Sequence, residues 1–165
     1  MNKVNNVWLM KTFKEWADRF MSANPQPYVA LDEPNVDLDY GKLSEAERKA
    51  LFNKLEKEAS KKRRWNQIKK FFDRFYDDVS EGDILVLGTG QTTKFHIYAI
   101  VKLTSQAYFV DEGDHSNSRH RRNVEILWMG DPIQMEKWGW ARRLECLDNE
   151  ERLKEFISVY THIKN

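Results

Sequence analysis

The stretch Gly82-Asp83-Ile84-Leu85-Val86-Leu87 marks the point at which the hydrophobic pattern of this sequence changes. Between Trp65 and Val79, apolar residues recur at the three- and four-residue spacing of an amphipathic helix. From Asp83 onward, short apolar runs alternate with polar links, which is typical of strands joined by turns. We therefore expect strands at residues 83–87, 95–103, 107–110 and 123–128.

The region before this stretch contains further predicted elements. Short apolar runs predict strands at residues 7–10 and 28–31. Ser44 and Glu47 have the spacing of a capping box, which predicts that a helix starts there. A closing helix is predicted over residues 149–163. Between the first two strands, helical spacing places on one face Phe13, Trp16, Ala17, Phe20 and Met21.

These elements follow the order strand, helices, strand meander, helix, without an internal repeat. A chain of 165 residues has the length of one compact domain. We expect a single α+β domain over residues 1–165, in which a curved mixed β-sheet or pseudo-barrel has helices packed outside it.

Composition narrows the class of protein. Hydrophobic residues make up 41% and charged residues 32%, which is typical of a globular chain and too apolar for a disordered one. The single cysteine, Cys146, excludes an internal disulfide and favours a reducing compartment. The longest apolar runs are strand-sized, and no signal peptide is apparent. We expect a cytoplasmic protein with no membrane partner.

The distribution of aromatic and basic residues is more informative than the net charge of +1. Aromatic residues make up 13% of the chain, more than one modest core needs. Some of them are expected to face a ligand, although an aromatic-rich core is the alternative. Basic residues cluster at 61–64, 69–70 and 119–122. Such clusters are usually solvated surface, but beside aromatic residues on a small domain they favour nucleic-acid binding.

Trp65 has two interpretations. It directly follows the basic residues Lys61, Lys62, Arg63 and Arg64. These side chains can hold phosphates while the indole ring stacks on a base. Alternatively, Trp65 begins the apolar stripe of its helix and packs in the core. The residues alone leave both interpretations open.

Signatures of catalysis are mostly missing. Gly88-Thr89-Gly90 with Lys94 lacks two features of a phosphate loop, namely a glycine directly before the lysine and a helix after it. Their absence favours a hairpin turn. A metal-dependent hydrolase built on Asp111, His115 and His120 is an alternative, but no regular spacing fixes these ligands. We expect a binding domain without enzymatic activity, cofactor or metal.

Several stretches resemble a known family. They resemble the EVE/YTH group of the PUA superfold over roughly residues 7–128. The loop at 119–122 and the stretch Asp37–Tyr40 are most similar to the DNA-binding N-terminal domains of archaeal McrB-type modification-dependent restriction proteins. The stretches that carry the resemblance are Val7-Trp8-Leu9-Met10-Lys11, Trp65, Gly82–Leu87, Ile97–Leu103, Ala107-Tyr108-Phe109 and Arg119–Trp128.

The resemblance implies a pocket that accepts a flipped, methylated base such as 6-methyladenine or 5-methylcytosine. On this basis we expect the base to contact Trp65, Trp8, Lys11, Thr12 and Phe109. YTH domains place a second cage tryptophan in the loop before the last strand, but residues 114–122 contain no aromatic residue here. The expected phosphate contacts are Lys61, Lys62, Arg63, Arg64, Lys69, Arg119, His120, Arg121 and Arg122.

The implied partner is DNA that carries a modified base. RNA is an alternative ligand of the same fold, and a protein-interaction module whose aromatics are all core is an alternative from another class. The resemblance also implies an AAA+ GTPase and a nuclease, fused to the domain or bound to it, with this chain as the N-terminal part of a longer protein.

Overall fold

The computed structural model describes residues 5–31, 33–60, 62–91, 94–111, 118–136, 138 and 143–165. Its strands are β1 (Val7–Lys11), β2 (Tyr28–Leu31), β3 (Ile84–Gln91), β4 (Lys94–Leu103), β5 (Tyr108–Phe109), β6 (His120–Met135) and β7 (Leu144–Cys146). Its helices are α1 (Lys14–Met21), α2 (Glu45–Glu58), α3 (Trp65–Asp73) and α4 (Glu150–Lys164), with a 3-10 turn η1 (Tyr40–Lys42) and a π-helical segment η2 (Arg74–Asp78).

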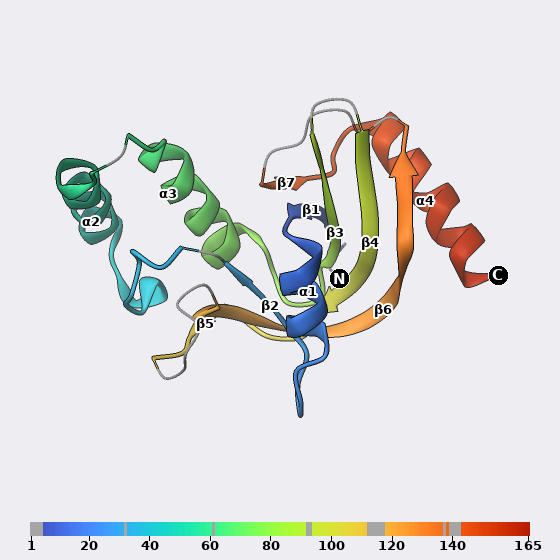
Figure 1. The fold of residues 1–165 in the computed structure, drawn as a ribbon, viewed down its shortest axis with the longest axis horizontal. Coiled ribbons are helices and arrows are strands. Elements are labelled where there is room, and N and C mark those ends of the chain that lie inside the picture. Colours follow the sequence, from blue (N-terminus) through green and yellow to red (C-terminus); the bar gives the residue numbers. More distant parts are fainter. Residues whose placement is uncertain are drawn as a thin grey trace.

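All described strands belong to one curled mixed sheet. Its order is β2-β6-β4-β3-β1-β7, and β5 pairs with β6. β1 and β3 run parallel, and the other paired strands are antiparallel. Figure 1 shows α2 and α3 on the side of the sheet where β2 and β5 lie, and α4 on the other side, beside β6. The expected α+β fold, a curved mixed sheet with helices outside, is confirmed.

The Gly82-Asp83 pair joins three strands. Gly82 has a φ of +93°, which favours glycine, and its amide donates to the carbonyl of Leu103 at the end of β4. The Asp83 side chain is 1% exposed. Its carboxylate accepts hydrogen bonds from the amides of Asn6 and Ser80 and from the indole Nε1 of Trp8. One buried side chain therefore fixes the start of β1 against the start of β3.

Two apolar clusters fill the two faces of the sheet. The larger one contains side chains from α1, α3, β2, β3 and β4. Phe72 and Tyr98 are fully buried in it. The smaller one lies where Phe156 of α4 packs near Trp138 and Phe95. Among the described residues, no helix is both long enough and apolar enough to cross a membrane.

β6 is much longer than the strand expected at residues 123–128. It begins at His120, so that most of the expected basic loop is strand. Its first four residues pair with β2, and the residues from Val124 onward pair with β4. A strand shared in this way must bend, and its pairing with β4 shifts register twice. β7, which pairs with β1, was not expected from the sequence.

The capping box is confirmed, whereas Gly88-Thr89-Gly90, which the sequence favoured as a hairpin turn, lies within a strand instead. The Ser44 hydroxyl accepts from the amide of Glu47, whose carboxylate accepts from the amide of Ser44. Gly88-Thr89-Gly90 lies in β3 and pairs with β4. A Cβ atom at Gly88 would lie 2.5 Å from the ring of Phe95, so that glycine permits the close approach of the two strands.

Replacing Asp83 with Ala is expected to destabilise the domain by about 3 kcal/mol or more, because one buried and two part-buried N–H groups would lose a charged acceptor. The change is measured by urea denaturation. The matched control is Asp78→Ala, since Asp78 is exposed and its loss should change stability by less than about 0.5 kcal/mol. Equal stabilities of the two variants would contradict this role of Asp83.

Candidate nucleic-acid interface

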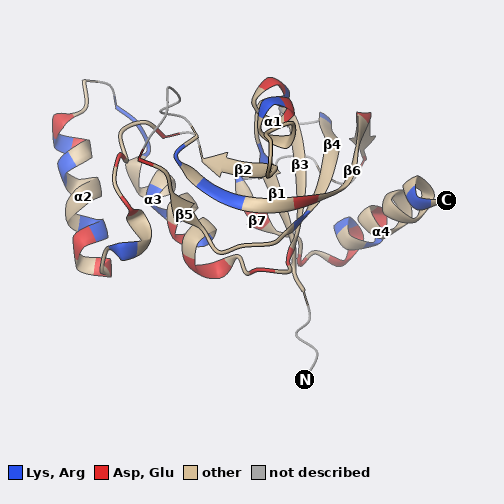
Figure 2. Ribbon diagram, turned by 90° about the horizontal axis from the view of Figure 1, so that it is seen from below, with Lys and Arg blue, Asp and Glu red and all other residues tan. Residues whose placement is uncertain are grey.

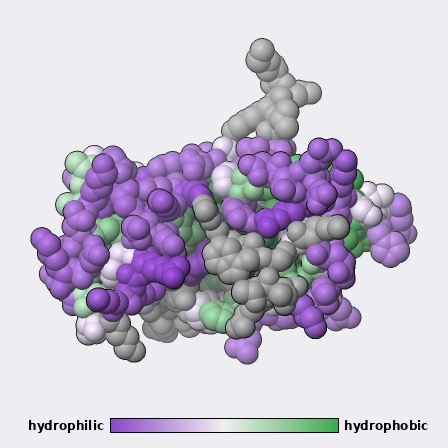
Figure 3. All heavy atoms as spheres, turned by 90° about the horizontal axis from the view of Figure 1, so that it is seen from above, coloured by the Kyte–Doolittle hydropathy of each residue, from purple (hydrophilic) through white to green (hydrophobic). Residues whose placement is uncertain are grey.

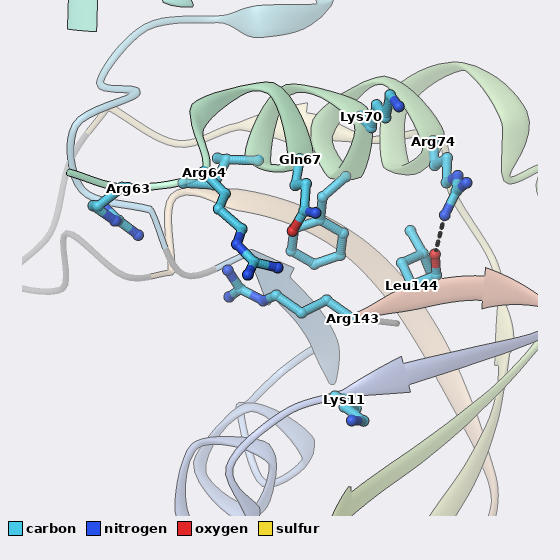
Figure 4. A pocket seen from close by; sticks show the side chains of 10 residues that line it. Lys11, Arg63, Arg64, Gln67, Lys70, Arg74, Arg143 and Leu144 are labelled. Carbon is cyan, nitrogen blue, oxygen red and sulfur yellow. Dashed lines mark hydrogen bonds between the residues drawn. The ribbon is translucent and has the colours of Figure 1, made fainter. Parts of the chain in front are cut away.

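A basic groove lies between α3 and the edge of the sheet formed by β1 and β7 (Figure 4). Its volume is about 560 Å³. Its described lining contains no Asp or Glu, but it contains six cationic side chains: Lys11, Arg63, Arg64, Lys70, Arg74 and Arg143. So dense a positive lining attracts anions.

Three of these arginines are held in place by neighbours. Both guanidinium NH groups of Arg63 bind the carboxylate of Glu33, at 3.0 and 2.8 Å, and Glu33 is 1% exposed. Arg74 donates to the carbonyl of Leu144 at 2.8 Å. The guanidinium of Arg143 lies 4.7 Å from the centre of the Phe71 ring. The groove is therefore preorganised on both its helix side and its strand side.

A second hollow of about 390 Å³ adjoins the groove, because Lys11 and Arg143 line both. Phe13 and Trp16 form one side of it, with ring centres 4.9 Å apart in an edge-to-face arrangement. Phe13 is 65% exposed. Trp16 is half-buried. An aromatic pair with one exposed ring beside cationic side chains can stack on a flat ligand that carries negative charge.

Polar groups complete the second hollow. Lys11 is the last residue of β1, Thr12 follows it, and Thr89 comes from β3. The amide of Thr12 donates to the carbonyl of Gly88, and the Tyr98 hydroxyl donates to the carbonyl of Thr12. Burial lowers the pKa of Lys11, and the nearby Glu145 carboxylate opposes that shift. Donors and acceptors thus stand at fixed positions next to the aromatic pair.

The structure brings together only some of the expected base-binding residues. Lys11 and Thr12 line the second hollow. Trp65 and Trp8 are instead core residues, 5% and 7% exposed. The expectation that they contact a base is therefore corrected: Trp65 packs near Phe52 in the larger apolar cluster, and the indole of Trp8 binds Asp83. Phe109, on β5, lines neither hollow.

Only some of the residues expected to contact phosphates lie at the groove in the folded chain. Arg63 and Arg64 line the groove. Lys62 is exposed but outside the groove lining, and Lys69 lies on another side of α3, where it binds Glu45 and Asp73. Lys61 lies outside the described residues. Figure 2 shows basic and acidic residues interleaved along α2, and Figure 3 shows hydrophilic residues dominating the described part of the face seen from above.

Arg122 cannot contact a phosphate, which corrects that expectation. It is 0% exposed, and its guanidinium donates to the carbonyls of Phe75, Val79 and Ser105. Burial lowers the pKa of Arg122 to about 10, so the group stays charged at neutral pH. Because the Arg122 guanidinium binds backbone carbonyls at and near η2, substitution of Arg122 would lower the stability of the fold.

His120 is likewise a structural residue, 1% exposed, and not a phosphate contact. Its Nε2 lies 2.6 Å from the carbonyl of Val36 and its Nδ1 lies 2.6 Å from the Tyr76 hydroxyl. A carbonyl can only accept, so Nε2 carries the proton and Nδ1 accepts from Tyr76. Burial lowers the pKa of His120, which the bond to Val36 opposes.

The neighbouring arginines lie against aromatic rings. Arg121 lies 4.1 Å from the ring centre of Tyr28, and Arg119 lies 5.6 Å from that of Phe109. Neither lines the groove or the second hollow. Of the hydrolase residues considered, His115 lies outside the described part of the chain. Among the described residues, no three His, Cys, Asp or Glu side chains are placed to hold a metal.

Sequence reasoning missed the residues that the fold adds to the site. Phe13 and Trp16 were placed on one face of a helix and were not expected at the site. α1 buries Ala17, Phe20 and Met21, whereas Trp16 is half-buried and packs against the edge of the larger apolar cluster. Phe13 precedes the first turn as the N-cap, a position that faces outward here. Lys70 belongs to a basic cluster seen in the sequence but was not assigned a phosphate contact. Arg74 and Arg143 were not expected at the site, and Arg143 is distant from α3 in the sequence.

The buried His120 predicts a pH dependence of stability. The unfolded chain binds a proton at His120 as the pH falls through about 6.5, whereas the folded protein binds it only at lower pH. The stability that this histidine contributes is present above that pH and is lost as the pH falls through the folded pKa. The melting temperature should therefore fall between pH 7 and pH 5 by more in the wild type than in His120→Gln, whose amide can still donate to Val36. Parallel melting curves for the two proteins would contradict this assignment.

Comparison with known proteins identifies the family of this chain but not its function. No curated protein matches the sequence. A family model described as a domain of unknown function (DUF8426) matches residues 24–146, more than half of the chain. The match includes α3 and Arg143, and leaves out β1 and α1. The chain therefore belongs to the DUF8426 family.

Proposed function

We propose that this chain is a DNA-binding domain that holds one base, extruded from the stack, in the hollow beside Phe13 and Trp16. The observation that carries the proposal is the junction of this aromatic hollow with the basic groove at Lys11 and Arg143. A volume of about 390 Å³ lies in the range of ligand pockets, roughly 300–1,000 Å³. Aromatic rings and phosphate-binding cations are the two parts of a single-strand binding site.

In this proposal, each group has a definite task. Phe13 and Trp16 replace Trp65 and Trp8 as the rings that contact the base. Lys11, Thr12 and Thr89 supply hydrogen bonds to its edge. A methyl group on the base adds apolar area that is cheaply removed from water against an aromatic ring. Together with the EVE/YTH resemblance, this supports a methylated base as the preferred ligand.

The proposed biological role is targeting. The domain would direct a nuclease, supplied by another domain or partner, to modified DNA, and would itself perform no chemistry. Extrusion costs a few kcal/mol of stacking, which the aromatic contacts and the edge hydrogen bonds recover. The test is a panel of matched DNA and RNA oligonucleotides with and without 6-methyladenine or 5-methylcytosine, measured by fluorescence anisotropy. Preference for methylated DNA supports the proposal, and equal binding of all members or preference for RNA contradicts it.

Phe13→Ala and Trp16→Ala should each weaken binding of the preferred oligonucleotide by about 1–3 kcal/mol, roughly 5- to 150-fold, because a stacking ring is lost. Binding to an unmodified duplex should change little. Trp65→Ala is the matched contrast. It should lower the free energy of unfolding by about 3–5 kcal/mol, because a large core side chain is lost. Unchanged affinity in both hollow variants would reject the aromatic pair as the base platform.

The salt dependence of binding tests the phosphate contacts. If Lys70 contacts one phosphate, Lys70→Ala should reduce the slope of log K against log salt concentration by about 0.7–0.9. Lys69→Ala is the control, because Lys69 is already paired with Glu45 and Asp73. It should leave the slope unchanged. Equal slopes in the wild type and both variants would remove Lys70 from the interface.

A further inference from the structure

α3 presents one uncharged polar side chain to the basic groove. Arg64, Gln67, Phe71 and Arg74 follow one another at spacings of three, four and three residues, so that they lie on one face of the helix. Figure 4 shows Gln67 between Arg64 and Lys70, with its side chain pointing from α3 toward the strand side of the groove. Within the described lining of the groove, Gln67 is the only polar side chain that carries no charge.

The backbone of Gln67 is fixed in the first turn of α3. Its N–H donates to the Arg64 carbonyl and to Asn66 Oδ1, at 2.9 Å each. The residue is exposed, and no other described residue forms a hydrogen bond with its side-chain amide. The carbonyl and NH2 groups of this amide can therefore bind a ligand without first breaking a bond within the described part of the protein.

The Gln67 amide differs chemically from the cations around it. Arginine and lysine side chains only donate, so they suit phosphates and, among base edges, the two acceptors of guanine. A glutamine amide places an acceptor beside a donor group. Adenine presents the complementary pair, the N7 acceptor and the N6 amino donor, and glutamine can bind both at once. Gln67 is therefore the described lining residue whose chemistry suits adenine.

We propose that Gln67 reads the base next to the extruded one and selects adenine at that position. The groove adjoins the aromatic hollow, because Lys11 and Arg143 line both, so a strand with one base in the hollow continues into the groove with its neighbouring nucleotide. The groove volume of about 560 Å³ lies in the range of ligand pockets, roughly 300–1,000 Å³. This inference rests on the proposed function and adds to it a second recognised base, so that the domain reads a modified base in a sequence context.

The first test varies the bases on either side of the recognised base in the oligonucleotide that the panel identifies as preferred. Adenine at one of these two positions should bind roughly 5- to 150-fold more tightly than the other three bases, measured by fluorescence anisotropy. Replacing that adenine with 7-deazaadenine, which lacks the N7 acceptor, should remove most of the advantage. A preference for guanine, whose two acceptors suit arginine, would assign the reading to the cations and overturn the role of Gln67.

The second test assigns the preference to this side chain. Gln67→Ala should abolish the adenine preference and leave the salt dependence of binding unchanged, because no charge is lost. Gln67→Glu should shift the preference toward cytosine, whose N4 amino group donates to a carboxylate. Gln106 is exposed and lines neither hollow, so Gln106→Ala and Gln106→Glu are the matched controls and should keep the adenine preference. Melting curves of all four variants should match the wild type, because both glutamines are exposed.

The outcomes separate this inference from the proposed function. Equal binding of all flanking bases, or an adenine preference that survives in Gln67→Ala, contradicts the role of Gln67 and leaves the DNA-binding proposal standing. If RNA is preferred and its adenine context is lost in Gln67→Ala, DNA is rejected as the ligand and the role of Gln67 is kept. If no oligonucleotide binds, both proposals fail.

Discussion

The buried carboxylate of Asp83 is the interaction on which the rest of this structure depends. It binds N–H groups from Asn6, Trp8 and Ser80, and so joins the entry to β1, the turn after η2 and the start of β3. With that corner fixed, the parallel register of β1 on β3 sets where β1 ends, at Lys11 opposite Gly88. The Asp83 carboxylate therefore helps to position Lys11, at the edge of the aromatic hollow, from the opposite end of the same two strands.

The arginines of this protein serve two different purposes, and burial separates them. Arg48 and Arg122 lie inside, where Arg48 binds Asp73 and Asp77 and Arg122 binds backbone carbonyls around η2. A buried guanidinium needs such partners, because an unpaired charge costs several kcal/mol. Arg64 instead lines an open groove and is exposed there, where water or a ligand can contact it. The same residue type thus holds the π-helical segment in place and forms the candidate interface.

The aromatic residues of this chain also serve two purposes, one in the core and one beside a hollow. Tyr40, Phe52, Phe72 and Tyr76 pack together between η1, α2, α3 and η2, where the Tyr40 hydroxyl donates to Asp73. These rings extend the larger apolar cluster of the sheet to α2 and α3. Most of the aromatic excess is therefore structural, and Phe13 and Trp16 are the pair that faces a hollow. An aromatic-rich core and a ligand-facing pair coexist in one chain.

Local sequence determined the elements whose signals are local: the change of period at Gly82-Asp83, the capping box at Ser44 and the first strand near residues 7–10. Lys11, Thr12, Arg63 and Arg64, which were expected to contact the ligand, line the two hollows. The tertiary structure alone decided that Trp65, Trp8, His120 and Arg122 are buried, because amphipathic spacing gives the face of an element but not what covers it. It alone brought Arg143 to Arg64 and Phe13 to Lys11, since β7 returns to the edge of β1 only when the sheet has formed.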